Sequence, residues 1–167
     1  HRMGFDRPVP VQYFDWLSKA VQGDFGTSFK FRENNWAIIR ERFPATLQLA
    51  ASALALGLIV AVPLGTVAAV NRGSVWDRVS MVVALIGQST PSFWMGLMLM
   101  LVFAVWLGWL PVSGRYEGLR SMVLPVITLS FYDIARNTRV IRGSLLEILG
   151  EDYVRTARAK GAPPRSV

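Results

Sequence analysis

Long uncharged stretches separated by short polar segments dominate the pattern of this chain. Residues 46–70 and 79–107 contain no Asp, Glu, Lys or Arg. An α-helix needs about 20 mainly apolar residues to cross the hydrocarbon core of a bilayer, so both stretches predict membrane spans. A third span is predicted at 121–141, where the last turns become polar. We therefore expect an all-α membrane protein, a polytopic transmembrane helical bundle with three spans in this chain.

The first predicted span carries small residues at every fourth position, beginning at Ala53. This spacing places them on one face of a helix. Small side chains at such a face allow the backbone of another helix to approach closely. We assign helix packing to Gly57, Ala61, Gly65 and Ala69.

The second predicted span is too long for a straight perpendicular crossing and should tilt or break. The segment 87–94, GQSTPSFW, contains a glycine, a proline and several polar side chains. Polar groups at mid-membrane depth cost free energy unless they pair with another helix or line a wet cavity. Two interpretations remain open, a translocation path for a solute and hydrogen bonding between helices without a transport role. The candidate path residues are Gln88, Ser89, Thr90 and Ser92.

Residues 1–45 are mixed in character and should face water. Segments 11–22 and 34–43 each predict a short amphipathic helix, the second leading to Pro44. Aromatic side chains favour the headgroup zone of a membrane, so these helices could lie along its surface. Packing of the aromatic rings against neighbouring protein is equally compatible with the pattern.

The end of the third span carries Arg136, Arg139 and Arg142 on one side of a helix. Such a strip suits lipid phosphate or an acidic neighbour. Asp133 is three residues before Arg136, so a local ion pair between these two is the simpler alternative. Seven Lys or Arg against three acids follow from Arg136 to the end, and the positive-inside rule therefore predicts a cytoplasmic C-terminal segment. Alternation then places residues 1–45 and 108–120 outside.

Residues 151–161 predict a separate polar helix of about two turns. Acidic residues stand at its beginning and basic residues at its end, as the helix macrodipole favours. Gly161 can adopt the left-handed cap, and Pro163 with Pro164 prevents continuation. Tyr153, Val154 and Ala157 would form a small apolar face. A helix this short needs a partner surface, which could be another protein or anionic headgroups.

The segment before this helix, 143–150, contains a possible new helix start. Ser144 and Glu147 have the spacing of a capping box, and Gly150 would separate this helix from the terminal one. Ser144 could equally be an ordinary helix residue.

Composition supports the membrane assignment and excludes several kinds of chemistry. Of the 167 residues, 52% are hydrophobic and 17% are charged. The chain has no cysteine and one histidine, which excludes a disulfide framework, a histidine-based triad and a nitrogen ligand set for zinc. No lysine is followed by Ser or Thr, so no phosphate-binding loop of the G-x-x-x-x-G-K-[ST] type is present. We expect no catalytic, cofactor or metal site in this chain, and the basic residues border apolar spans instead of forming a nucleic-acid groove.

The segment RTARAKG, 155–161, resembles the cytoplasmic loop signature of permease subunits of ABC importers. In that signature an E-A-A triplet is followed by glycine four residues after its last alanine. Ala157 and Gly161 keep this spacing, whereas Arg155 and Thr156 replace the glutamate and the first alanine. Permeases of the peptide/nickel class show a similar departure from the signature. Six segments resemble that class in the same order: GDFGTS (23–28), RFPATLQLA (42–50), PSFWMG (91–96), LGWLPVSG (107–114), LPVITL (124–129) and SLLEILGEDYVRTARAKG (144–161).

The resemblance implies a helical permease with about six spans, of which this chain holds the second to fourth. The chain begins with His1, and we interpret it as a piece of a longer protein. It would comprise an extracytoplasmic segment, 1–45, and a permease core, 46–167, with a cytoplasmic coupling loop at 143–163. The loop would form a coupling helix seated on an ATPase subunit. The residues assigned to coupling are Glu151, Asp152, Tyr153, Val154, Arg155, Ala157, Arg158, Lys160 and Gly161.

The same resemblance implies partners and a location. The expected partners are a second, non-identical permease subunit, two cytoplasmic ATPase subunits that hold ATP and Mg²⁺, and an extracytoplasmic substrate-binding protein. The location would be the cytoplasmic membrane of a bacterium or archaeon. The solute would be a dipeptide or oligopeptide, with nickel complexes, glutathione or another small solute as alternatives. A membrane scaffold without a path is a further alternative, and a membrane-embedded enzyme is disfavoured because the spans hold no nucleophile and base.

Overall fold

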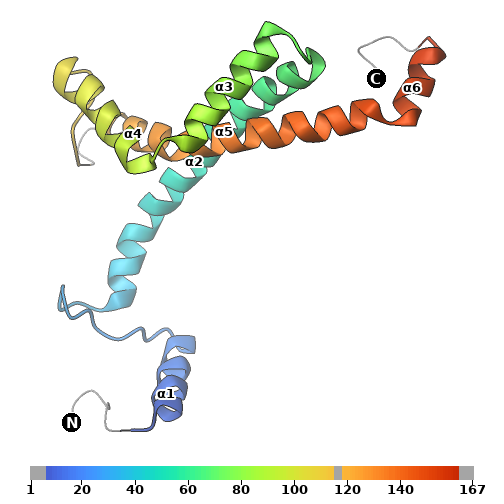
Figure 1. The fold of residues 1–167 in the computed structure, drawn as a ribbon. Coiled ribbons are helices and arrows are strands. Elements are labelled where there is room, and N and C mark those ends of the chain that lie inside the picture. Colours follow the sequence, from blue (N-terminus) through green and yellow to red (C-terminus); the bar gives the residue numbers. More distant parts are fainter. Residues whose placement is uncertain (1–6, 115–117, 162–167) are drawn as a thin grey trace. The chain divides into compact units, whose positions relative to one another are not determined.

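The computed structural model describes residues 7–114 and 118–161, and these residues fold into helices without a strand. The elements are α1 (Val9–Val21), α2 (Asn35–Val70), α3 (Val75–Ser89), α4 (Ser92–Leu99), the π-helix η1 (Met100–Trp106), α5 (Arg120–Gly150) and α6 (Asp152–Ala159) (Figure 1). The chain divides into two compact units, 1–48 and 49–167. The remaining residues, including the predicted stop at Pro163 and Pro164, lie outside the described part of the chain.

In the first unit, α1 is amphipathic, and its aromatic side chains are exposed. Its first turn follows Pro8 and contains Pro10, whose fixed φ favours the start of a helix. Tyr13, Phe14 and Trp16 are each more than half exposed. On the polar side, Lys19 donates a 2.9 Å hydrogen bond to Asp15, and this bond together with the lysine charge lowers the pKa of the Asp15 carboxyl. A partner for the aromatic face, membrane or protein, stays a prediction.

The prediction of a separate helix at 34–43 is wrong. These residues form the first turns of α2, which continues through Pro44 to Val70. Proline removes one backbone hydrogen bond, and propagation through the apolar residues that follow outweighs this loss. The beginning of α2 is fixed by the preceding loop, where the Asn35 amide donates to the Phe25 carbonyl at 2.8 Å and the Phe25 ring stacks on Trp36.

In the second unit, α5 is the helix on which α3 and α4 pack (Figure 1). The contact with α3 is close at Gly87, where an added Cβ would lie 2.7 Å from the Cβ of Ala135. The contact with α4 runs along Gly96, where an added Cβ would lie 3.3 Å from the Thr128 methyl group. Glycine at these two positions therefore sets the distance between the helices.

The small-residue stripe of α2 faces α5. The assigned residues Gly57, Ala61, Gly65 and Ala69 are all buried. An added Cβ at Gly65 would lie 2.9 Å from both the Cβ of Ile141 and the carbonyl oxygen of Thr138. At Gly57 the corresponding distance, to the Cβ of Asp133, is 3.7 Å. The two helices are therefore closest at the Gly65 end of the stripe.

The predicted interruption within 87–94 lies at Thr90 and Pro91. Helix α3 ends at Ser89, α4 begins at Ser92, and the two directions differ by 101°. Thr90 adopts an extended conformation, as a residue before proline favours. The break therefore follows from local backbone chemistry.

One helix of the described chain, α2, is long and apolar enough to cross a membrane. The α3 helix and the segment Ser92–Trp106 reach that length and hydropathy only together, and the 101° bend between them fits a broken span or a re-entrant loop. The third predicted span lies in α5, which does not qualify because charged residues occupy its middle. These are Asp133, Arg136, Arg139 and Arg142. The fold class is that of a helical membrane protein, and the count of three spans stays a prediction.

Candidate functional site

Helix α6 is a short separate helix at the C-terminal end of α5 (Figure 1). Glu151 has ψ 150°, so the α-helical path is interrupted at this residue and restarts at Asp152. Acidic Asp152 is in the first turn and basic Arg158 in the last, which agrees with the macrodipole. Gly161 has φ +83°, the left-handed conformation that ends the helix. Residues 151–161 therefore form a compact projection of fixed length.

The apolar face predicted for this helix is divided between the protein and solvent. Val154 is 2% exposed, whereas Tyr153 is 63% exposed. Ala157 is half-buried. The outer surface of α6 consists of Tyr153 and charged side chains. The exposed charged residues are Glu151, Asp152, Arg155, Arg158 and Lys160. Val154 thus anchors the helix to its own chain and is shielded from an external partner.

The prediction of a new helix that starts at Ser144 is wrong. Helix α5 runs without interruption from Arg120 to Gly150, so Ser144 and Glu147 lie within it. The serine spacing was misleading because the backbone donors of residues 144–147 already have partners inside the helix. The first half of the predicted coupling loop at 143–163 is therefore a rigid extension of α5, and the change of direction occurs only at Glu151.

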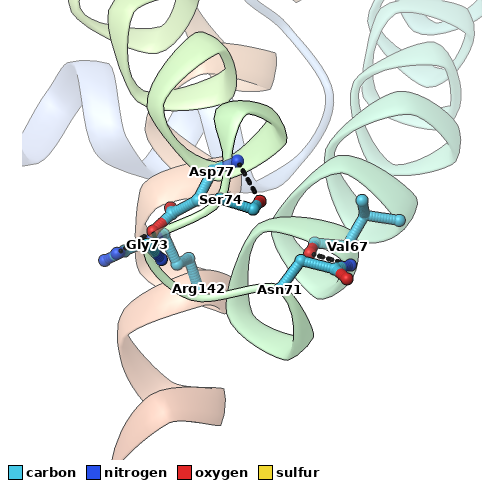
Figure 2. A network of polar contacts seen from close by, with 6 residues as sticks. All are labelled: Val67, Asn71, Gly73, Ser74, Asp77 and Arg142. Atoms are coloured by element: carbon cyan, nitrogen blue, oxygen red, sulfur yellow. Dashed lines mark hydrogen bonds and ion pairs between the residues drawn. The ribbon is translucent and has the colours of Figure 1, made fainter.

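An ion pair joins the first turn of α3 to α5 (Figure 2). The Arg142 guanidinium donates to both carboxylate oxygens of Asp77, through Nε at 2.5 Å and Nη2 at 2.8 Å. Asp77 is 5% exposed, and the Arg142 side chain is 23% exposed. A buried bidentate pair fixes both the distance and the orientation of its partners. Asp77 is therefore the acidic neighbour of Arg142, one of the two kinds of partner predicted for the strip of arginines.

The turn between α2 and α3 is closed by hydrogen bonds around the same carboxylate (Figure 2). The Gly73 backbone N–H donates to Asp77 at 2.9 Å, and the Asp77 backbone N–H donates to the Ser74 hydroxyl at 3.2 Å. Ser74 is the N-cap of α3, and Gly73 has φ +79°, which favours glycine. Asn71 continues the network by donating to the Val67 carbonyl at the end of α2. We call Asp77, Arg142 and the turn 71–74 the clamp.

Sequence reasoning missed the clamp. Asp77 was visible as the lone acid in a short turn between two apolar stretches, and Arg142 as part of an arginine strip. Nothing in the spacing linked two residues that are 65 positions apart. The simpler alternative for this region, an ion pair between Asp133 and Arg136, is not formed within residues 7–114 and 118–161. Arg139 instead donates to the Gln88 side-chain oxygen.

A second polar region lies at the break between α3 and α4. An open pocket of about 480 Å³ is lined by all four candidate path residues, Gln88, Ser89, Thr90 and Ser92. Helix α5 supplies the opposite wall, with Thr128, Tyr132 and Asp133. The structure therefore brings the four residues together at one pocket and adds an acidic side chain that was not assigned to it.

Comparison with known proteins identifies the class of this chain. A family model described as "Binding-protein-dependent transport system inner membrane component" matches residues 61–167. The chain belongs to this family. The matched region begins within α2 and includes the clamp, the pocket and α6.

Individual members of the family are similar along nearly the whole chain. The di/tripeptide transport system permease protein DppB of Pseudomonas aeruginosa is 38% identical over 100% of this chain and 58% of its own length. The oligopeptide transport system permease protein OppB of Salmonella typhimurium is 40% identical over 96% of this chain and 53% of its own. A putative peptide permease protein of Brucella suis is 42% identical over the same shares. The predicted resemblance to peptide permeases is confirmed, and the chain spans somewhat more than half the length of these family members.

Proposed function

We propose that this chain forms the central part of a permease subunit in an ATP-driven importer of dipeptides or oligopeptides. The observation that carries the proposal is the similarity to permeases of peptide transport systems over 96% to 100% of the chain. The subunit would act in a bacterial cytoplasmic membrane and would not be an enzyme itself. Its partners would be a second permease subunit, two ATPase subunits that bind ATP and Mg²⁺, and an extracytoplasmic binding protein.

In this proposal the chain crosses the membrane three times. The first crossing is α2, the second is the bent path through α3, α4 and η1, and the third is the N-terminal part of α5. The basic residues of α6 favour the cytoplasmic side by the positive-inside rule. The clamp would then lie at the cytoplasmic ends of α2, α3 and α5, and residues 1–45 would lie outside with the 108–120 loop.

Helix α6 acts as the coupling helix that contacts the ATPase. Tyr153 supplies an exposed aromatic side chain of the kind that anchors protein interfaces, surrounded by charged groups. The buried Val154 transfers a displacement of α6 to α5, and the clamp transfers it from α5 to the turn between α2 and α3. Because α5 has no break before Gly150, such a displacement moves the connected helices as a rigid body.

The pocket at the α3–α4 break forms part of the translocation path. Its polar walls are supplied by Gln88, Ser89, Thr90 and Ser92 on one side and by α5 on the other. Polar side chains within a membrane protein commonly face a wet cavity or another helix. A rigid-body displacement of α3, α4 and α5 would carry this pocket relative to the other subunits of the importer, which would link the coupling helix to the solute.

The experiment that tests the proposal is ATP-dependent uptake of a radiolabelled dipeptide into proteoliposomes that contain the complete importer. We expect Gly161→Val to abolish uptake because a β-branched residue is strained at φ +83°. Ala157→Asp should do the same by placing an unpaired charge at the half-buried side of α6. Both variants should remain in the membrane at normal levels and lose copurification with the ATPase.

The matched control is Gly143→Ala, a glycine substitution in α5 where an added Cβ meets open space. It should retain wild-type uptake. Normal uptake by both Gly161→Val and Ala157→Asp would remove the coupling role from α6. Absence of ATP-dependent peptide uptake by the wild-type importer would overturn the proposed function as a whole.

A further inference from the structure

Asp133 is a half-buried carboxylate beside the α3–α4 break. Its side chain lines the pocket, and it makes no hydrogen bond or ion pair within residues 7–114 and 118–161. The base of the side chain is close to α2, because an added Cβ at Gly57 would lie 3.7 Å from the Asp133 Cβ. An ionised group inside a membrane protein is costly unless a partner of opposite charge reaches it. A cation that enters the pocket from outside the described helices would supply such a partner.

Hydroxyl oxygens near Asp133 are also available as acceptors. Thr90 donates its hydroxyl proton to the Ile86 carbonyl at 2.7 Å, and Thr128 donates to the Leu124 carbonyl at 2.7 Å. With their protons engaged inside the helices, both hydroxyls can only accept hydrogen bonds from a molecule in the pocket. This arrangement favours a ligand group that donates several hydrogen bonds and carries positive charge.

The arginines of α5 do not supply that charge. Arg142 is paired with Asp77, and Arg139 donates to Gln88 at the rim of the pocket. Arg136 is exposed and is not one of the lining residues. The cation for Asp133 is thus left to the molecule that enters the pocket, whose volume of about 480 Å³ is within the range of small-ligand sites.

We propose that Asp133 binds the N-terminal ammonium group of the transported peptide at the α3–α4 break. The inference rests on the proposed function, because it takes a peptide as the solute. An ammonium group has three donors and no acceptor, which suits a pocket lined by a carboxylate and by hydroxyls that can only accept. The α-amino group has a pKa of about 7.7–8.0, so most peptides carry this charge at neutral pH. Residues Ser89 and Ser92 on the other wall would contact the rest of the peptide without selecting its sequence.

The test is equilibrium binding of radiolabelled alanyl-alanine to the complete importer in detergent, measured without the extracytoplasmic binding protein. Because the binding protein is absent, any preference for one dipeptide over another must come from the membrane subunits. We expect the wild type to bind the free dipeptide about 10- to 100-fold more tightly than its N-acetylated form, the range for one charge-assisted hydrogen-bonded contact. Asp133→Asn should lower the affinity for the free dipeptide to that of the acetylated one. Asp133→Glu should preserve the preference.

The matched control is Glu147→Gln, which removes an exposed acid from the same helix outside the pocket and should leave the preference unchanged. Equal binding of the two dipeptides by the wild type overturns the inference, and so does an Asp133→Asn variant that still prefers the free amino group. Wild-type proteoliposomes are assayed for ATP-dependent uptake in parallel. Retained uptake without discrimination rejects the role of Asp133 alone, whereas loss of uptake in the wild type rejects the proposed function.

Discussion

The two interruptions of the helices in the second unit are built in opposite ways. The turn between α2 and α3 is closed, because Asp77 is 5% exposed and is held by Arg142, Gly73 and the adjacent Ser74 cap. The break between α3 and α4 is open, because its polar residues line a pocket and Asp133 beside it has no partner in the described part of the chain. Both interruptions lie against α5.

This difference separates a mechanical role from a binding role. A closed turn makes the helices on either side of it move together, since motion would break a buried ion pair. An open break provides polar groups to which a solute can form hydrogen bonds, since these groups are not all paired within the protein. One helix, α5, contacts both and thereby connects them.

The largest effect is expected from breaking the clamp. Arg142→Ala leaves the buried Asp77 carboxylate without its charged partner, which should cost at most about 3–5 kcal/mol of stability. Asp77→Ala should cost less, because the Arg142 side chain that it leaves unpaired is 23% exposed. The double variant should be less destabilised than the sum of the two single variants, because it leaves neither charge behind. Thermal unfolding of the detergent-solubilised protein measures the effect.

The control for this experiment is the exposed ion pair of α1. Asp15→Ala removes a pair of similar length, 2.9 Å, at a solvent-exposed position and should leave the melting temperature almost unchanged. Clamp variants that are as stable as Asp15→Ala would show that the turn is not locked, and the contrast between the two interruptions would disappear.

A smaller effect is expected from overfilling the contact between α2 and α5. Gly65→Ala places a methyl group 2.9 Å from the Thr138 carbonyl oxygen and from Ile141, so the helices must separate, at a cost of about 1–3 kcal/mol. Gly57→Ala is the matched control, since its methyl group would be in ordinary contact at 3.7 Å. Membrane levels and melting temperatures of both variants test this, and equal behaviour would contradict the close approach at Gly65.

The smallest effect is expected at the open break. Gln88→Ala removes the exposed hydrogen bond from Arg139 and should cost less than about 1 kcal/mol, because water can replace it. The variant should melt within a few degrees of the wild type. A loss comparable to that of Arg142→Ala would show that the break is as firmly held as the turn.

Local features of this protein could be predicted from the sequence. The break at Thr90 and Pro91 follows from proline and the polar residues around it, and the α6 helix follows from Glu151, the charge order and Gly161. The stripe on α2 follows from its spacing of four. In each case the signal lies within one helical segment, where periodicity and backbone preferences act directly.

Features that depend on distant residues could not be predicted. The clamp requires that α3 and α5 pack in one particular register, which no local pattern specifies. Ser144 gave a false helix start because its capping spacing also occurs inside continuous helices. Val154 was assigned to a partner because the sequence does not show that its side chain is already buried within this chain.

The 101° bend also sets the depth at which a solute first meets polar side chains. The proposed crossing consists of two arms, α3 and the α4–η1 segment, each about 22 Å long. Two arms that differ in direction by 101° would span a hydrocarbon core about 30 Å thick only if both were inclined to the membrane normal, by about 50° each. The kink would then lie near the middle of the core, and a solute would have to reach that depth before it met these polar side chains.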